Sequence, residues 1–449
     1  MSTDLRAAVD RVLPGVRRDL EALVRIPSVS ADPDRADDVR RSADVVAELA
    51  RGAGAAEARV LSVHGGAPAV VASWPAPEGA PTVLLYAHHD VQPTGDRAAW
   101  ATEPFEPTER EGRLYGRGAA DDKAGVMAHV AALRAYDGRP PVGVTLFVEG
   151  EEEVGSPTFV PFLESHRELL GADVIVVADS SNWAVGVPAL TTSLRGLAHV
   201  VVEVRTLDHH VHSGMYGGPV PDATTVLIRL LATLHDERGD VAVAGLVAGK
   251  AADVDYPEDV FRADAGLLDG VALIGTGSLP DRLWTRPALT VVGMDVPSVA
   301  GAANVLQPTA RAEVSLRLAP GQDPAAAVEA LTAHLTSHVS FGAQVVVTPA
   351  DTGAPTALEA SGPAYDAVRA AFREAWDGVE PVDIGVGGSI PFIAEFARLF
   401  PEAAVLVTGV EDPDSRAHGA DESLHLAEFA RVCHAEALLL SRLAAPSTS

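Results

Sequence analysis

The stretch Gly150-Glu151-Glu152-Glu153-Val154-Gly155-Ser156 follows the apolar run Val142–Val148, and Glu149 stands between them. An apolar run of this length predicts a buried β-strand. Two carboxylates about 4 Å apart repel each other by about 4 kcal/mol at an effective dielectric constant near 20. Acids gathered at the end of a core strand therefore indicate a positive partner there, whereas the same acids alone would indicate only a solvated loop. The rest of the chain decides between the two interpretations.

Around this stretch, strands alternate with helices. The hydrophobic pattern predicts strands at 59–63, 69–73, 82–86, 142–148 and 174–178, and helices at 5–23, 34–51, 124–136 and 161–170. Strands alternating with amphipathic helices are typical of an α/β domain with helices on both faces of the sheet.

The pattern changes after about residue 194. The order of predicted elements is strand 197–204, helix 223–234, strands 289–294 and 312–318, helix 324–335 and strand 344–348, with a mostly loop-like insertion over 236–287. This βαββαβ order predicts a ferredoxin-like α+β domain. The α/β pattern resumes from about residue 362, with a strand at 404–408 and a last helix from about 424. The sequence thus predicts an α/β domain of residues 1–194 and 353–449, interrupted by an inserted domain of residues 195–352.

Composition excludes several classes of function. The chain has 449 residues and a net charge of −28, which argues against binding to nucleic acid or to an anionic membrane. The single cysteine, Cys433, excludes a disulfide framework and a cysteine metal cluster. The sequence has no signal-peptide pattern and no apolar run of about 18 residues. We therefore expect a cytoplasmic protein.

Acidic and imidazole side chains follow the predicted core strands. They are His88 and Asp90, Asp121, Glu152 and Glu153, Asp179, and His418. The carboxyl ends of strands in an open α/β sheet form the ligand crevice. Imidazole with carboxylate suits zinc, with manganese or cobalt possible, and there are too many carboxylates for one structural zinc. Two divalent ions that share one carboxylate fit better.

Seven stretches carry a family resemblance. They are AHHDVQP at 87–93, GRGAADDKAG at 116–125, GEEEVGS at 150–156, ADS at 178–180, HSGMYGG at 212–218, GGSIP at 387–391 and AHGADE at 417–422. In this order, with the inserted lid, the chain resembles the M20 metallopeptidases, and within them the carnosinase-like dipeptidases. The carnosinase-like pattern has Arg-Glu where this chain has Gly385-Val386. The arginine of that pattern, which implies one contact in the substrate pocket, is therefore missing from this chain.

The resemblance implies a role for each residue of the centre. The implied metal ligands are His88, Asp121 as the bridging carboxylate, Glu153, Asp179 and His418. Glu152 corresponds to the general base, and Asp90 to the acid that orients the imidazole of His88. The family also implies a cis peptide bond between Asp121 and Asp122. His89 would point away from the centre and be structural.

Other implied residues belong to substrate binding. His212 resembles the lid histidine that reaches the reacting carbonyl, supplied in dimeric relatives by the partner subunit, so a homodimer is expected. Asn304, Arg317, Gly388 and Ser389 correspond to contacts with the substrate, Arg317 as a clamp for its carboxylate. A surface ion pair is the alternative for Arg317, and the functional and structural interpretations of Asn304 are nearly balanced.

The function implied is hydrolysis of the amide bond of dipeptides or similar small substrates with a free carboxylate. An N-acyl-amino-acid deacylase (aminoacylase) using the same site is the nearer alternative. The resemblance favours the dipeptidase branch, because the residue at position 179 is an aspartate, whereas aminoacylases more commonly have a glutamate there. A catalytically inactive metal-binding scaffold is the remote alternative, and the intact Glu152 argues against it.

Overall fold

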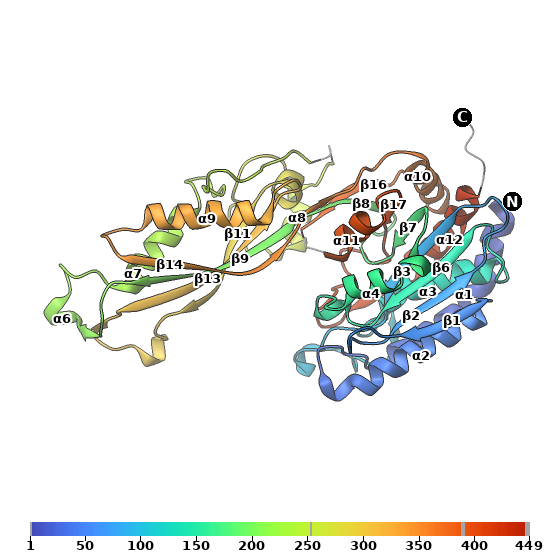
Figure 1. The fold of residues 1–449 in the computed structure, drawn as a ribbon, viewed down its shortest axis with the longest axis horizontal. Helices are drawn as coiled ribbons and strands as arrows, with labels where there is room; N and C mark the ends of the chain where they lie inside the picture. The colour runs from blue at the N-terminus through green and yellow to red at the C-terminus, as the bar shows by residue number, and fades with distance from the viewer. Residues whose placement is uncertain (1, 252–253, 388–390, 445–449) are drawn as a thin grey trace. The chain divides into compact units, whose positions relative to one another are not determined.

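The computed structural model describes residues 2–251, 254–387 and 391–444, and the chain forms two compact units (Figure 1). The first unit contains the chain up to Thr192, Glu359–Ile384, and the chain from Glu395 onward. The second contains Ser193–Leu358 and Gly385–Ala394. Residues 385–394 thus group with the second unit, although the sequence pattern placed them in the catalytic domain.

A mixed sheet forms the centre of the first unit. Its strands lie in the order β1-β2-β6-β3-β7-β17-β8. Their bounds are β1 (Glu57–Leu61), β2 (Ala69–Trp74), β3 (Thr82–His88), β6 (Gly143–Glu149), β7 (Val174–Val177), β8 (Ala189–Leu194) and β17 (Ala404–Val407). Strands β6, β3, β7 and β17 are parallel neighbours, so their carboxyl ends meet at one edge. Strand β16 (Val382–Val386) also pairs with β8, and β15 (Thr356–Ala357) pairs with the end of β8.

Helices cover both faces of this sheet, as predicted (Figure 1). One core contains side chains of α1 (Ser2–Val24), α2 (Ala36–Gly52), α3 (Lys123–Ala135), α10 (Pro363–Ala375) and α12 (Leu426–Leu443). Leu85 and Ala87 of β3 belong to that core. Tyr86 between them packs edge-on against Phe159 of α4 (Phe159–Ser165) and Phe396 of α11 (Pro391–Leu399). Alternate strand residues face opposite sides, so the two helix layers lie on opposite faces.

The second unit is the predicted α+β domain. Its sheet has the order β11-β13-β9-β14, all antiparallel, and its elements follow one another as βαββαβ. They are β9 (Gly196–Arg205), α7 (Ala223–Leu231), β11 (Ala288–Asp295), β13 (Thr309–Leu318), α9 (Pro324–His338) and β14 (Gln344–Gly353). Side chains of β9 alternate between buried and half-buried. The buried ones, Ala198, Val200, Val202 and Val204, pack with those of α7 and α9.

Smaller elements complete the two units. The second unit also has β10 (Val211–His212), α6 (Ser213–Tyr216), β12 (Val305–Leu306) and, within the predicted insertion, α8 (Glu258–Asp264). The first unit has a three-stranded sheet of β18 (Ser423–His425), β5 (Arg113–Tyr115) and β4 (Thr108–Arg110).

Two predicted helices differ from the structure. The predicted helix 161–170 is divided at His166 into α4 and α5 (Arg167–Leu170). The last helix begins at Leu426, after strand β18, because the Nδ1 of His425 accepts a hydrogen bond from the backbone N–H of Glu428 and caps the helix there. A search of the described helices for one long and apolar enough to span a membrane finds none.

Candidate metal centre

The parallel strands bring the predicted ligands to one edge of the sheet. His88 is the last residue of β3, and it lies beside Glu149, the last residue of β6. Glu152 and Glu153 follow β6 in a short 3-10 turn. Asp179 follows β7, which pairs with the other side of β3. Because these ends are neighbours, short turns are enough to direct acids that follow β6 and β7 toward His88.

Asp121 lies between two histidines. Its Oδ1 is 3.1 Å from Nε2 of His88, and its Oδ2 is 3.0 Å from Nε2 of His418. The same nitrogen of His418 is 3.1 Å from Oε2 of Glu153, while Nε2 of His88 is 4.0 Å from Oδ1 of Asp179. The five side chains therefore form two groups that share Asp121: His88 with Asp179 on one side, and His418 with Glu153 on the other.

The donor atoms are close enough to hold cations. Ligand atoms of His88, Asp121 and Glu153 lie within 4.8 Å of one another, and so do those of His88, Glu152 and Asp179. Imidazole nitrogens with carboxylate oxygens are donors that zinc, manganese and cobalt accept. These two sets share His88, and Asp121 belongs to the first of them. The contacts of Asp121 with both His88 and His418 are what would let its carboxylate serve two ions.

Charge also favours cations at this position. In the metal-free chain, the pKa of Asp179 is raised to about 7, chiefly by burial and also by the nearby Asp121 and Glu153, against the opposing charge of His88. Burial followed by Asp179 raises the pKa of Glu152 well above its usual range. Hydrogen bonds to Asp121 and Glu153 raise the pKa of His418 to about 11. Without metal, the crowded carboxylates thus favour protonation of this cluster. Divalent ions, when bound, would supply the positive charge in place of these protons.

Asp90 connects the imidazole of His88 to the glutamate turn. It is fully buried, and its Oδ1 is 3.4 Å from Nδ1 of His88. Its two oxygens accept hydrogen bonds from the backbone N–H groups of Glu152 (3.2 Å) and Glu153 (3.1 Å). Nδ1 of His88 also lies 3.1 Å from the backbone carbonyl oxygen of Asp90. The main chain and the carboxylate of Asp90 thus both orient this predicted ligand, as is common for histidines that bind metal, and the carboxylate also holds the backbone of the predicted base.

The turn that carries Asp121 is fixed by its neighbour. The peptide bond between Asp121 and Asp122 is cis, which confirms that prediction. Asp122 caps α3 by accepting a hydrogen bond from the N–H of Gly125, and its other oxygen accepts one from the N–H of His88. The carboxylate of Asp122 thus faces the backbone, and that of Asp121 faces the histidines.

Glu422 and Arg117 connect two loops of the centre, and the sequence analysis quoted both within its family stretches without assigning either a role. The carboxylate of Glu422 is fully buried and accepts hydrogen bonds from the N–H groups of Gly118, Ala120 and Asp121, at 3.0 to 3.1 Å. It also pairs with Nη1 of Arg117 at 2.6 Å. Nη2 of Arg117 donates to the carbonyl oxygen of His418 at 3.1 Å. This buried pair therefore ties the loop of His418 to the loop of Asp121.

Glu411 is a third residue to which the sequence analysis assigned no role. It follows β17 at the same edge of the sheet, and burial, then Asp121 and Asp179, raise its pKa well above the usual range. Its position after a core strand was the available signal.

The predicted substrate-binding residues belong to the second unit. His212 is exposed, and its Nδ1 accepts a hydrogen bond from the N–H of Gly214 at 3.0 Å. Asn304 lies beside it, because its carbonyl oxygen accepts from the N–H of Ser213 at 2.9 Å. Arg317 is half-buried on β13, and the described part of the chain offers it no ion pair, so its predicted alternative as a surface salt bridge has no support. Gly388 and Ser389 lie outside the described residues.

His89 is structural, as predicted. Its Nε2 lies 2.8 Å from the carbonyl oxygen of Pro68, and burial lowers the pKa of its side chain to about 4.

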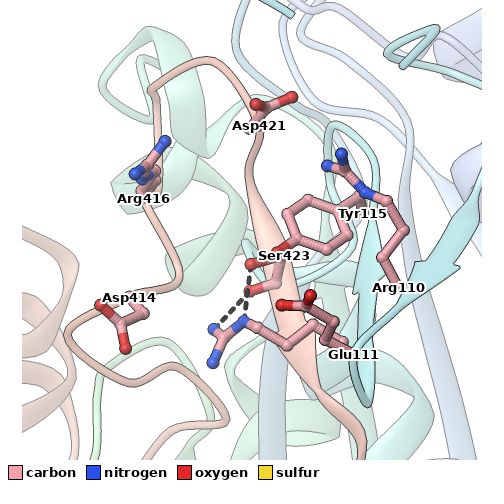
Figure 2. Close-up of a pocket in the computed structure, with 8 residues that line it drawn as sticks. Arg110, Glu111, Tyr115, Asp414, Arg416, Asp421 and Ser423 are labelled. Carbon is pink, nitrogen blue, oxygen red and sulfur yellow. Dashed lines mark hydrogen bonds between the residues drawn. The ribbon is translucent and has the colours of Figure 1, made fainter. Parts of the chain in front are cut away.

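A pocket of about 440 Å³ lies elsewhere on the first unit (Figure 2). Its lining comes from the small sheet of β4, β5 and β18 and the loop before β18, and consists of Arg110, Glu111, Arg113, Tyr115, Asp414, Arg416, Asp421 and Ser423. Cations and acids are mixed in this lining, and none of the predicted metal ligands is part of it.

Comparisons with known proteins point to one family. The model of peptidase family M20/M25/M40 matches residues 84–442. The chain is 38% identical, over 80% of its length and 81% of the relative, to a cysteinylglycine-S-conjugate dipeptidase of Corynebacterium striatum. It is 30% identical to the human Beta-Ala-His dipeptidase over 73% of this chain and 68% of that protein. The crystal structure of human carnosine dipeptidase 1 superposes with a TM-score of 0.80 and 26% identity, covering 99% of this chain and 98% of that one.

Proposed function

Because the chain belongs to peptidase family M20/M25/M40, we propose that it is a dinuclear metallopeptidase that cleaves dipeptides. The observation that carries the proposal is the carboxylate of Asp121 placed between His88 and His418, with Glu153 and Asp179 on either side. The names of two relatives, cysteinylglycine-S-conjugate dipeptidase and Beta-Ala-His dipeptidase, support dipeptides as the substrate class.

Zinc is the ion that we propose for both positions, and manganese or cobalt would suit the same donors. Two such ions, when bound, would polarise the scissile carbonyl and acidify a water molecule.

Within this proposal, Glu152 is the general base. Its carboxylate accepts the proton of the attacking water, whose oxygen bonds to the carbonyl carbon. The same carboxyl group then gives the proton to the amine nitrogen as the carbon–nitrogen bond breaks, which balances the reaction. The hydrogen bonds from the N–H groups of Glu152 and Glu153 to Asp90 hold the base in place while Asp90 orients His88. His212 would donate a hydrogen bond to the oxygen that becomes negative.

A substrate panel tests the reaction class. We expect protein loaded with zinc or manganese to hydrolyse cysteinylglycine and β-alanyl-histidine with a higher kcat/KM than N-acetyl amino acids of the same carboxyl-terminal residue. The names of two relatives, both dipeptidases, support this order of preference. A preference for the N-acetyl compounds would instead establish the deacylase alternative. A metal-loaded protein that is inert on both series would establish the inactive scaffold.

We also propose that the protein is a homodimer and that His212 serves the partner's site. The second unit exposes large apolar side chains, among them Met215 (74% exposed), Tyr216 (49%) and Val299 (96%). Met215 and Tyr216 lie in the helix that His212 caps. Exposed apolar side chains next to a functional loop are typical of an interaction surface.

Subunit mixing tests this arrangement. The His212→Ala homodimer and the Glu152→Gln homodimer should each be nearly inactive. Both sites of the first lack the histidine, and both sites of the second lack the general base. In a mixed dimer, one site combines the intact Glu152 of one chain with the intact His212 of the other, so activity should return to about half the wild-type value per mixed dimer. Exchange is followed by native mass spectrometry of chains carrying different tags. Exchange without any return of activity would place His212 in its own subunit's site or outside catalysis.

A further inference from the structure

The pocket beside the small sheet of β4, β5 and β18 has no part in the proposed reaction. Its volume is about 440 Å³, which is within the range of about 300–1,000 Å³ that is typical of small-molecule sites. Figure 2 shows Arg110, Glu111 and Tyr115 on the side of the small sheet, and Asp414 and Arg416 on the loop before β18. All of these residues belong to the first unit. The pocket is therefore large enough for a small ligand, and its lining carries both signs of charge.

Arg110 presents a fixed cation to this pocket. Its guanidinium carbon lies 4.0 Å from the centroid of the ring of Tyr115. Its Nε is buried and has no hydrogen-bond partner among the described residues, and no carboxylate of those residues pairs with it. A guanidinium that stacks on an aromatic ring keeps the donors at its edge available. The ring of Tyr115 therefore holds Arg110 in place without using its hydrogen-bond donors.

Arg416 is a second cation of the lining, whereas a third arginine is already engaged. The side chain of Arg416 is exposed and makes no ion pair or hydrogen bond within the part of the chain that the structure describes. Nη2 of Arg113, in contrast, donates to both carboxylate oxygens of Asp412, at 3.0 and 2.9 Å. Its Nε donates to Oγ of Ser423 at 2.8 Å. Arg113 thus fastens the loop to the small sheet, and Arg110 and Arg416 are left for a ligand.

Two acids of the lining are also without partners. The carboxylates of Glu111 and Asp414 are exposed, and neither pairs with a residue of the described ranges. Asp421 differs, because its Oδ1 accepts a hydrogen bond from the N–H of Ala101 at 2.9 Å. The acids would repel a ligand that is only an anion, and the arginines would repel one that is only a cation. A ligand that carries both charges can satisfy both sets.

We propose that this pocket binds a free α-amino acid. The carboxylate of the amino acid is held by Arg110 and Arg416, since the planar fork of a guanidinium matches a carboxylate. Its ammonium group is held by Glu111 and Asp414. The proposed peptidase reaction releases free amino acids, but the site follows from the charges of the pocket and does not rest on that reaction.

Isothermal titration calorimetry of the metal-loaded protein tests the class of ligand. The probes are L-alanine, which carries both charges, N-acetyl-L-alanine, which carries only the negative one, and L-alaninamide, which carries only the positive one. An exposed ion pair contributes up to a factor of about five in affinity. We expect the Kd of L-alanine to be lower than that of either analogue by about this factor. N-acetyl-L-alanine binding as tightly as L-alanine would make the pocket a simple anion site and overturn the proposal.

Variants of the lining locate the ligand. Arg110→Met and Arg416→Met keep the apolar stem, and each should weaken L-alanine binding by about fivefold without weakening the binding of L-alaninamide. In the double variant Glu111→Gln, Asp414→Asn, L-alanine and N-acetyl-L-alanine should bind equally, because the groups that distinguish them are gone. The control is Arg40→Met on α2, another exposed arginine with no ion pair in the described ranges, which is not part of the lining. This variant should bind all three probes as the wild type does.

The unliganded Tm of both arginine variants should equal that of the wild type, because neither arginine has a protein partner to lose. A change in affinity then cannot come from unfolding. L-alanine binding that both arginine variants leave unchanged would overturn the proposal, and its disappearance after treatment with a chelator would then place the amino acid on the metal ions. A protein that binds L-alanine through these arginines and hydrolyses no dipeptide would overturn the proposed function and leave the amino-acid site in place.

Discussion

Replacing Glu152 by glutamine should lower kcat by at least about 100-fold, the lower range of what a general base contributes. Glutamine keeps the size of the side chain and its ability to accept a hydrogen bond, but it cannot take the proton of the attacking water. The backbone N–H of residue 152 would still donate to Asp90, so the turn should keep its conformation. Steady-state kinetics on a dipeptide, together with metal analysis of the same sample, measures both consequences.

Two other glutamates provide the comparison. Glu153→Gln should lose metal as well as activity, because Glu153 is 3.1 Å from His418 and belongs to the ligand set that we propose. Glu164→Gln, the same change at an exposed position of α4, should alter neither quantity. If Glu152→Gln keeps more than about a tenth of the wild-type kcat, Glu152 is not the base.

Asp121→Asn should remove both activity and most of the bound metal. Each oxygen of Asp121 lies against a different histidine, at 3.1 Å from His88 and 3.0 Å from His418. An amide has no negative charge and presents only one oxygen, so it cannot serve both positions. Metal analysis after loading and dialysis should give at most one ion per chain, and kcat/KM should fall to the background of the assay.

An exposed aspartate serves as the control for this variant. Asp137→Asn lies just beyond the end of α3 and should bind as much metal as the wild type. Because Asp121 is buried, circular dichroism should accompany the metal analysis to show that the Asp121→Asn chain is folded. A folded Asp121→Asn protein with the wild-type metal content would show that this carboxylate does not bridge two ions.

The sequence predicted those parts of the site that follow from strand order. His88 is the last residue of β3 and Asp179 comes shortly after β7, and parallel neighbours place such residues at one edge. The general rule that ligands bind at the carboxyl ends of the strands in an open sheet therefore predicted from the sequence alone that these residues lie close together. The alternation along β3 likewise predicted that His89 would face away, and its side chain contacts Pro68 instead.

Residues that act through long loops could not be predicted in this way. Glu422 comes just before β18, a strand that the sequence pattern did not predict because it assigned residues from about 424 to the last helix. The partners of Glu422, which are Gly118, Ala120 and Asp121, lie about 300 positions earlier in the chain. Neither residue type nor spacing indicates that one carboxylate will accept three backbone hydrogen bonds.

The central claim is that Asp121 joins two metal positions in one chain. It is tested most directly by counting the ions bound to the wild-type protein with inductively coupled plasma mass spectrometry. The protein is stripped with a chelator, titrated with zinc or manganese, and separated from free metal before analysis. The structure predicts saturation at two ions per chain, as expected for a two-metal hydrolase. Saturation at one ion per chain with both metals would contradict it.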